Sequence, residues 1–168
     1  MLLFIYVLIV FILVADFGLE RYLALLNIKH SKTKLPEILS DIYDAEKYAK
    51  QQDYFRTNAG FGMLTSSFSF IITLLMYVFG GFGWLDQFLL NYVENDILRS
   101  LVFFAVIFLA NDLLTTPFSW YDTFVIEERF GFNKVTPAIF ILDKLKGYLI
   151  TGIIGGGLLY LIIWIYQL

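Results

Sequence analysis

Cysteine is absent from the 168-residue sequence, and histidine occurs only once, as His30. Without cysteine, the chain forms neither disulfides nor thiolate metal sites, and the redox compartment stays undetermined. A catalytic zinc site with two histidines one helical turn apart also needs a third ligand and a glutamate base. One histidine cannot supply this set. We therefore interpret His30 as a solvated loop residue, and we predict no metal site and no peptide hydrolysis by this chain alone.

Other catalytic patterns are missing as well. The sequence has no Gly-x-Ser-x-Gly motif, no Walker motif and no Cys/His nucleophile arrangement. Glu127 and Glu128 are adjacent carboxylates, but neighbouring residues usually point apart. Their adjacency alone therefore does not indicate an acid/base pair.

Charge is scarce in this chain. Charged residues make up 16% of it, hydrophobic residues 59%, and the formal net charge is −3. The mean hydropathy is +0.72. A soluble domain usually has about 45–50% apolar and about 25% charged residues. The composition therefore predicts a membrane protein whose surroundings are a lipid bilayer. Because no basic cluster occurs, we predict no nucleic-acid partner.

Four apolar stretches have about the length of a membrane-spanning helix, which needs about 20 residues. The first begins as an unbroken apolar run at Leu2. No basic segment precedes this run and no small-x-small cleavage site follows it, which argues against a signal peptide. We predict an all-α integral membrane protein with about four transmembrane helices and amphipathic juxtamembrane helices. The predicted spans are residues 2–26, 57–85, 100–121 and 147–168.

The clearest amphipathic pattern precedes the second span. Pro36 can open a helix, and Ile38, Ile42, Ala45 and Ala49 then recur at helical spacing. We expect a helix here that can run straight into the span.

Three further boundaries follow from charge and proline. Asp86–Arg99 is predicted to be a short acidic connector, and Pro137–Lys146 a short interfacial helix before the fourth span. Pro117 removes a backbone donor and is expected to kink or end the third helix.

Basic residues concentrate in the first and third polar loops, whereas the second loop carries only Arg99. The positive-inside rule then places residues 27–56 and 122–146 in the cytoplasm. Both termini would face outward. In a bacterium, the membrane would be the inner membrane.

Three carboxylates fall within or close to the predicted spans. Asp16 and Glu20 are four residues apart and share one helical face, and Asp112 lies in the third span. A charge at mid-bilayer costs roughly 2.5–3.5 kcal/mol on insertion scales. These residues therefore either face protein or water, or lie at the interface, and the sequence leaves both alternatives open. One function compatible with the first alternative is a small transporter or ion-conducting oligomer with a polar path along them.

The most polar and least repetitive part of the chain is Phe124–Pro137. Its centre, residues 127–129, carries two carboxylates and a guanidinium. Gly131 allows a backbone turn that a residue with a Cβ resists. Thr136 and Pro137 are typical of a helix start, with a hydroxyl N-cap followed by proline. We predict a shaped loop that leads into a helix. It is either a solvated connector at the membrane surface or a buried charged loop of a membrane enzyme.

Extended back to Thr116 and forward to Gly147, this segment resembles the type I CAAX prenyl protease family of integral-membrane zinc metallopeptidases. The matching pattern is Pro-Phe-Ser-aromatic-Tyr-x-Thr-Phe-Val-Ile-Glu-Glu-Arg-Phe-Gly-Phe-Asn-Lys-x-Thr-Pro, which is long and highly specific. A weaker match covers Glu20–Leu23 and Pro36–Arg56. The resemblance is to the N-terminal membrane domain and extends over nearly all of residues 1–168, but it covers only the first part of a family member.

The resemblance implies that residues 1–168 build one wall of a water-filled chamber inside the membrane. The His-Glu-x-x-His motif and the zinc it holds would belong to a catalytic half that this chain lacks. Substrates would be CAAX-type or membrane proteins. Partners would be that C-terminal half or, if the chain is a freestanding scaffold, a separate metalloprotease subunit.

In this interpretation, Glu127, Glu128 and Arg129 form an ion-pair and hydrogen-bond network that fixes the third and fourth spans relative to the zinc half. Phe130 and Phe132 would pack the loop. The predicted loop comprises Glu127, Glu128, Arg129, Phe130, Gly131, Phe132 and Asn133, the last as a cap or brace.

Overall fold

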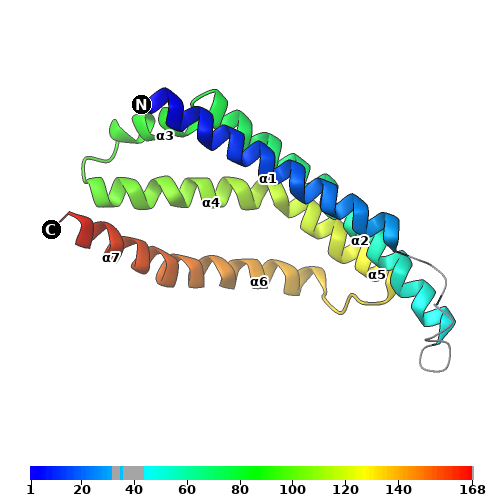
Figure 1. The fold of residues 1–168 in the computed structure, drawn as a ribbon. Helices are drawn as coiled ribbons and strands as arrows, with labels where there is room; N and C mark the ends of the chain where they lie inside the picture. Colours follow the sequence, from blue (N-terminus) through cyan, green and yellow to red (C-terminus); the bar gives the residue numbers. More distant parts are fainter. Residues whose placement is uncertain (32–34, 36–43, 168) are drawn as a thin grey trace. The chain divides into compact units, whose positions relative to one another are not determined.

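The computed structural model describes residues 1–31, 35 and 44–167, and this part of the chain consists of helices and their connections (Figure 1). The α-helices are α1 (Leu2–His30), α2 (Ala45–Val78), α3 (Gly81–Leu90), α4 (Asp96–Tyr121), α5 (Glu128–Phe130), α6 (Pro137–Ile150) and α7 (Gly156–Tyr166). Two π-helical turns, η2 (Asp122–Glu127) and η3 (Thr151–Gly155), join α4 to α5 and α6 to α7.

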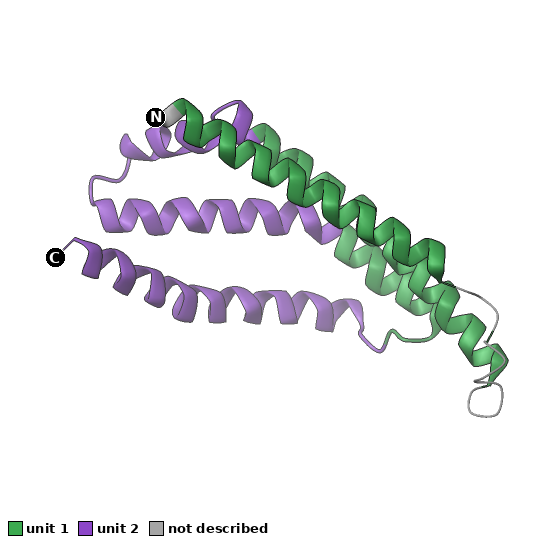
Figure 2. Ribbon diagram, viewed as in Figure 1, with its two compact units in different colours: residues 1–75, 118–133 green, residues 76–117, 134–168 purple. Residues whose placement is uncertain are grey.

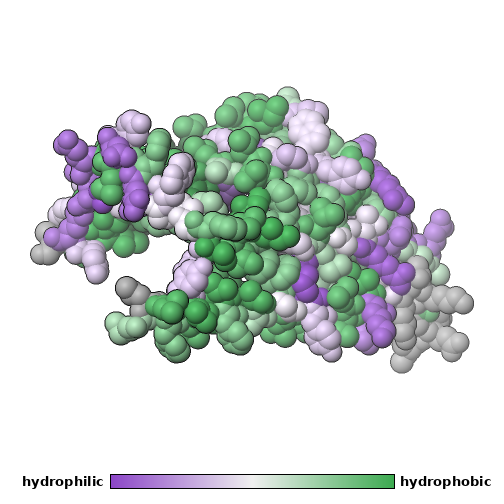
Figure 3. Space-filling view, turned by 90° about the horizontal axis from the view of Figure 1, so that it is seen from above, coloured by the Kyte–Doolittle hydropathy of each residue, from purple (hydrophilic) through white to green (hydrophobic). Residues whose placement is uncertain are grey.

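Four continuous helical stretches are long and apolar enough to cross a bilayer: Leu3–His30, Ala45–Val78, Asp96–Phe130 and Pro137–Tyr166. This confirms the predicted all-α membrane fold with about four spans. Apolar side chains cover most of the face visible in Figure 3. Leu3 and Ile153, for example, are 75% and 74% exposed. A soluble protein rarely leaves so much apolar surface in water, so this surface suits a lipid environment.

The chain divides into two compact units (Figure 2). Unit 1 comprises Met1–Leu75 and Phe118–Asn133, and unit 2 comprises Met76–Pro117 and Lys134–Leu168. In unit 1, aromatic side chains join the helices. Phe17 of α1 stacks on Phe70 of α2, with ring centroids 3.9 Å apart.

Aromatic rings also join α2 to the end of α4 within unit 1. The ring of Phe61 lies 5.1 Å from that of Tyr121, and the ring of Phe68 lies 4.9 Å from that of Phe118. Offset or tilted aromatic pairs of this kind add about 0.5–1.5 kcal/mol beyond their burial.

The predicted helix before the second span exists, because α2 runs without a break from Ala45 into the apolar stretch. Pro36, Ile38 and Ile42 lie outside the described residues. Asp44 starts the helix: its Oδ1 accepts hydrogen bonds from the backbone N–H groups of Glu46 and Lys47, both at 2.9 Å. These bonds satisfy two of the backbone donors that a helix start leaves without partners.

We predict that Asp44→Ala loosens the first turn of α2. The hydrogen bond from the Lys47 backbone holds the pKa of the Asp44 carboxyl below its ordinary value. A lowered pKa means that this stabilisation is present above the unfolded-state pKa and is lost as pH falls through the folded-state value. Amide hydrogen exchange at Glu46 and Lys47 should be faster in the variant near neutral pH, and the difference should shrink in acid. Equal exchange at both pH values would contradict the capping role.

The acidic connector is shorter than predicted. Residues 86–90 belong to α3, whose Leu85 and Leu89 lie one turn apart and are buried. The connector is residues 91–95, and Asn95 accepts a hydrogen bond from the Leu98 N–H at the start of α4. The prediction failed because it weighed the charges in this segment and overlooked the apolar helical spacing that buries one face of α3.

Pro117 was predicted to kink or end the third helix, and it does not end it. Helical structure continues through it and η2 to Phe130, over Asp96–Phe130. Hydroxyl groups bond to the backbone just before the proline: Thr115 donates to the Asn111 carbonyl at 2.8 Å and Thr116 to the Asp112 carbonyl at 2.6 Å. Neither carbonyl is that of Leu113, whose helical donor Pro117 removes. Membrane helices tolerate proline where a local change of helix type compensates, and the π-turn η2 follows at Asp122.

The interfacial helix predicted at Pro137–Lys146 is not separate from the fourth span. Helical structure is continuous over Pro137–Tyr166 through η3. The charges of this segment do not interrupt it because they are paired, Lys146 with Asp143 at 3.4 Å and Lys144 with a carboxylate of α4.

Candidate functional site

The segment Phe124–Pro137 is mostly helical, so the prediction of a loop along its whole length was wrong. Residues up to Phe130 belong to η2 and α5, and the loop is residues 131–136. Gly131 ends the helix with a φ of 79°, as the sequence indicated. Its N–H donates to the Glu128 carbonyl at 3.0 Å. At the other end, the Thr136 side chain accepts a hydrogen bond from the Ile139 N–H, and Pro137 occupies the first helical turn of α6.

The end of this helix packs against α2. Ile126 and Phe130 are only 4% and 5% exposed, and they are two of the few buried side chains among the described residues. The Tyr54 ring of α2 meets the Phe130 ring edge-on at 5.3 Å and the Phe132 ring at 4.7 Å. Phe132 itself is 51% exposed. Phe130 is therefore the anchor of the segment.

Two of the three charged side chains at the centre of the segment are exposed. Glu127 is half-buried, whereas Glu128 and Arg129 are exposed. Asn133 donates to Oε2 of Glu128 at 3.0 Å. The Arg129 guanidinium lies over the Phe130 ring, 5.4 Å from its centroid. No ion pair joins Arg129 to either glutamate within the described chain. The network of these charges with a second protein part stays a prediction.

We predict that Gly131→Ala destabilises this turn by about 1–2 kcal/mol, the cost of a left-handed backbone for a residue with a Cβ. Steric exclusion is not the cause, because the nearest atom to an added Cβ is Lys50 Nζ at 3.9 Å. The control is Gly147→Ala in α6, where φ is helical and nothing lies within 4 Å. The control should be neutral or stabilising. Thermal unfolding in detergent checks both, and equal effects would contradict the backbone explanation.

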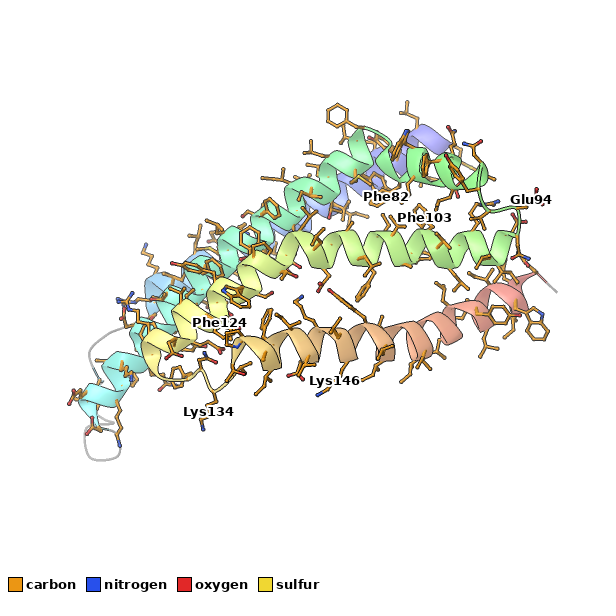
Figure 4. All side chains as sticks on the ribbon, turned by 180° about the vertical axis from the view of Figure 1, so that it is seen from behind. Phe82, Glu94, Phe103, Phe124, Lys134 and Lys146 are labelled. Carbon is orange, nitrogen blue, oxygen red and sulfur yellow. The ribbon has the colours of Figure 1, made fainter. Side chains whose placement is uncertain are left out.

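A second polar cluster surrounds Asp112 within unit 2, where α4 and α6 run side by side (Figure 4). Lys144 Nζ lies 2.7 and 2.9 Å from the two Asp112 carboxylate oxygens. The Tyr148 hydroxyl also donates to this carboxylate, and the Thr116 hydroxyl lies 3.2 Å from it. The Asp112 and Lys144 side chains are each 23% exposed. Asp112 is therefore a satisfied, partly buried ion-pair partner between two spans.

Asp112 was predicted from the sequence as an intramembrane polar residue, whereas Lys144 and Tyr148 were not. They lie one turn apart on α6 and 32 and 36 residues from Asp112. A signal was present: extending the fourth apolar stretch back to Pro137 puts a lysine inside a span, where a charge needs a partner. By contrast, Lys146 is 69% exposed and points away from α4 (Figure 4).

The other two predicted intramembrane carboxylates, Asp16 and Glu20, are exposed on α1 in unit 1. Asp112 belongs to unit 2, so a polar path through all three residues stays a prediction. The neighbouring Arg21 points toward α2. It donates to the Ser66 hydroxyl, and its guanidinium lies 4.8 Å from the Phe17 ring centroid.

The described residues do not fit a zinc ion. Across residues 1–31, 35 and 44–167, no group of three His, Cys, Asp or Glu side chains could hold a metal ion. His30 is exposed at the end of α1, rather than in a loop as predicted, and its Nδ1 lies 2.8 Å from the Leu26 carbonyl. No catalytic step is therefore assigned to a metal on these residues.

Residues 24–168 match the family described as CAAX prenyl protease N-terminal, five membrane helices. The chain belongs to this CAAX prenyl protease N-terminal family. The predicted resemblance is thereby confirmed. The family description gives five membrane helices, and the described part of this chain contains four helices of spanning length.

Individual CAAX prenyl proteases are similar to this chain in sequence. CAAX prenyl protease 1 of Saccharomyces cerevisiae is 32% identical over 165 residues, which is 92% of this chain and 36% of the relative. The CAAX prenyl protease 1 homolog of Dictyostelium discoideum is 33% identical over 156 residues, 86% of this chain and 36% of the relative. The chain thus spans about a third of the length of these curated relatives.

The fold is also that of a solved CAAX prenyl protease relative. The crystal structure of S. mikatae Ste24p matches with a TM-score of 0.86 and 30% sequence identity. The match covers 96% of this chain and 39% of the crystallised chain.

Proposed function

We propose that this chain acts as the N-terminal membrane domain of a zinc metalloendopeptidase, forming part of the wall of its intramembrane chamber. CAAX-type or membrane-protein substrates would be cut by a zinc site on another part of the protein or on a separate subunit. The observation that carries the proposal is the agreement with Ste24p over 96% of this chain, at a TM-score of 0.86. The family match over residues 24–168 supports it independently.

The charged end of the third span is the proposed contact with the zinc-bearing part. Arg129 and Glu128 are exposed at the end of the continuous helical stretch Asp96–Phe130. Phe130 is buried against Tyr54 and gives their backbone a fixed position. Exposed charges on a fixed support are suited to pairing with a partner surface.

The proposed orientation follows the charge of the loops. Residues 27–56 and 122–146 would lie in the cytoplasm, and both termini on the opposite side of the membrane. The concentration of lysine and arginine in these two segments supports this orientation. The charged end of the third span would then meet its partner on the cytoplasmic side.

A chimera tests the function. This chain would replace the matching region of the yeast CAAX prenyl protease 1, and cleavage of a CAAX-type peptide would be measured in proteoliposomes. We expect the chimera to cleave and Arg129→Ala to lower kcat/KM at least tenfold, which corresponds to about 1.4 kcal/mol of lost transition-state stabilisation.

Lys146→Ala is the matched control, because Lys146 is a cation on an exposed face of α6 and is 69% exposed. It should leave cleavage unchanged. A folded, zinc-loaded chimera without cleavage would argue against the domain assignment. If the chimera cleaves and Arg129→Ala does not change its kcat/KM, the domain assignment remains supported but the proposed contact through Arg129 is wrong.

A further inference from the structure

Unit 2 contains a groove of about 800 Å³ between α4 and the helical stretch that runs from α6 through η3 into α7. Its lining comes from residues in the range 101–111 on one side and 148–159 on the other. At 1.5 Å per helical residue, the groove is about 15 Å long. It adjoins the Asp112 cluster, because Tyr148 belongs to both, but most of its lining has no part in that cluster.

Most of the groove lining is apolar. Glycines at positions 152, 155 and 156 leave much of the α6–α7 side without side chains. At Gly152 and Gly156, no atom lies within 4 Å of the place that a Cβ would take, so the space beside their backbone is open. The larger apolar lining residues include Leu101, Phe104, Phe108 and Leu159.

The polar groups of the groove gather toward one end. The polar lining residues are Asn111, Tyr148 and Thr151. The two sides run antiparallel, because Phe108 lies beside Tyr148, whereas a later residue of α4 bonds to an earlier residue of α6. Asn111 and Tyr148 therefore lie at the same end, and Thr151 follows Tyr148 by about one turn. A ligand with one polar group on an apolar body matches this distribution.

The side chain of Asn111 needs a hydrogen-bond partner. It lies near the middle of the spanning stretch Asp96–Phe130. The Asn111 carbonyl accepts a hydrogen bond from Thr115, but its side-chain amide has no partner among the residues that the structure describes. Placing an amide in an apolar environment without a hydrogen bond is costly. An occupant that bonds to this amide would remove that cost.

The groups at the polar end favour a hydroxyl. The charges beside it are already paired, Lys144 with Asp112, so a charged head group would find no counter-charge and would be costly at this depth. The Tyr148 hydroxyl donates its proton to Asp112, and its oxygen can still accept. The Asn111 amide both donates and accepts. A hydroxyl, which also does both, can bond to each of them.

The width of the groove favours a broad, rigid body. A volume of about 800 Å³ over this length corresponds to a mean cross-section on the order of 50 Å², which is wider than a single alkyl chain. A single chain would leave voids and lose dispersion contacts with the walls. Fused rings fill more of the width and lose little conformational entropy on binding. Apolar grooves of this volume with a few polar groups are typical small-molecule sites.

We propose that this groove binds a lipid alcohol of the sterol type. Its hydroxyl bonds to Asn111 and Tyr148, and its rings lie along Phe104, Phe108 and the glycine side of η3. The inference goes beyond the proposed protease role and does not depend on it, because it concerns the residues of unit 2 alone.

Photo-crosslinking tests the site. The full chain would be reconstituted in phosphatidylcholine nanodiscs with a trace of cholesterol that carries a diazirine on its rings, and the labelled peptides would be mapped by mass spectrometry. We expect label within residues 101–111 and 148–159, lowered at least fivefold by excess cholesterol. Label spread evenly over all spans, or insensitive to cholesterol, would overturn the proposal. Competition by oleyl alcohol as strong as that by cholesterol would overturn the ring-shaped occupant.

Two neighbouring glycines of α7 give a matched pair of variants. Gly156 lines the groove and Gly157 does not, and an added Cβ meets no atom within 4 Å at either position. Consecutive helical residues point about 100° apart. Gly156→Phe should therefore fill the groove and lower the cholesterol-sensitive label at least tenfold, whereas Gly157→Phe should leave it unchanged. Equal labelling of the two variants would overturn the site.

The hydroxyl contact is tested first without any substitution. Cholestane has the same rings without the hydroxyl, so it should compete for the site at least tenfold less well than cholesterol. Asn111→Leu should reduce this difference at least fivefold by weakening cholesterol and leaving cholestane unchanged. Equal competition by the two compounds against the unsubstituted chain would overturn the hydroxyl contact. A preference for cholesterol that survives Asn111→Leu in full would overturn the role of Asn111.

Discussion

Replacing Asp112 by alanine should destabilise unit 2 by about 3–5 kcal/mol, the usual cost of removing one partner of a buried ion pair. The carboxylate receives hydrogen bonds from Lys144 and Tyr148 of α6. Its loss leaves the Lys144 ammonium without a counter-charge inside a membrane-spanning stretch. Unfolding of the reconstituted chain by increasing sodium dodecyl sulfate, followed by circular dichroism, measures the loss.

The decisive control is the double variant Asp112→Ala, Lys144→Met. Methionine keeps much of the length of the lysine side chain and removes its charge, so most of the lost stability should return. Replacing a buried pair by apolar residues is often neutral or stabilising. If the double variant is as unstable as Asp112→Ala alone, the cost lies in packing around Asp112 and the unpaired charge is not the cause.

Phe130→Ala should also destabilise the protein strongly, by about 3–5 kcal/mol, as expected for a buried phenylalanine. Phe130 is 5% exposed and packs edge-on against Tyr54 of α2, so its loss opens a cavity where the third span meets the second. The same detergent-unfolding measurement applies. Ile126 is also buried and lies four residues before Phe130, so its amide exchange should become faster.

Phe132→Ala is the matched control for this prediction. Phe132 meets the same tyrosine ring at 4.7 Å but is 51% exposed. Its removal should cost clearly less, since little buried volume is lost. Equal effects of the two substitutions would show that contact with Tyr54, rather than burial, determines stability at this helix end.

The number and type of spans could be predicted from the sequence because a bilayer requires long apolar helices, and such stretches are visible in any hydropathy profile. Their ends could not. Pro117 was predicted to kink or end its helix and the charges of α6 to form a separate interfacial helix, yet both lie inside continuous helices. The charge of Lys144 is compensated by the carboxylate of Asp112, 32 residues away, and this compensation depends on tertiary structure.

The site was predictable to a similar degree. Gly131 and Thr136 act through their own backbone, so local sequence was sufficient to place the turn and the helix start. Asp112 could be singled out from its position in a span, but its partner Lys144 lies 32 residues away. The prediction that Phe130 and Phe132 pack this segment did not distinguish the two, and only Phe130 is buried, because its burial depends on where Tyr54 of α2 lies.

The π-turn η3 gives the fourth span a built-in angular offset. Its wider ring accommodates one residue more than an α-helical turn would, and each residue of an α-helix corresponds to about 100° of rotation. The side of α6 that carries Lys144 and the corresponding side of α7 therefore point in different directions. Shortening Thr151–Gly155 by one residue would rotate all side chains of α7 about the helix axis relative to α6. The ion pair between Lys144 of α6 and Asp112 would stay unchanged.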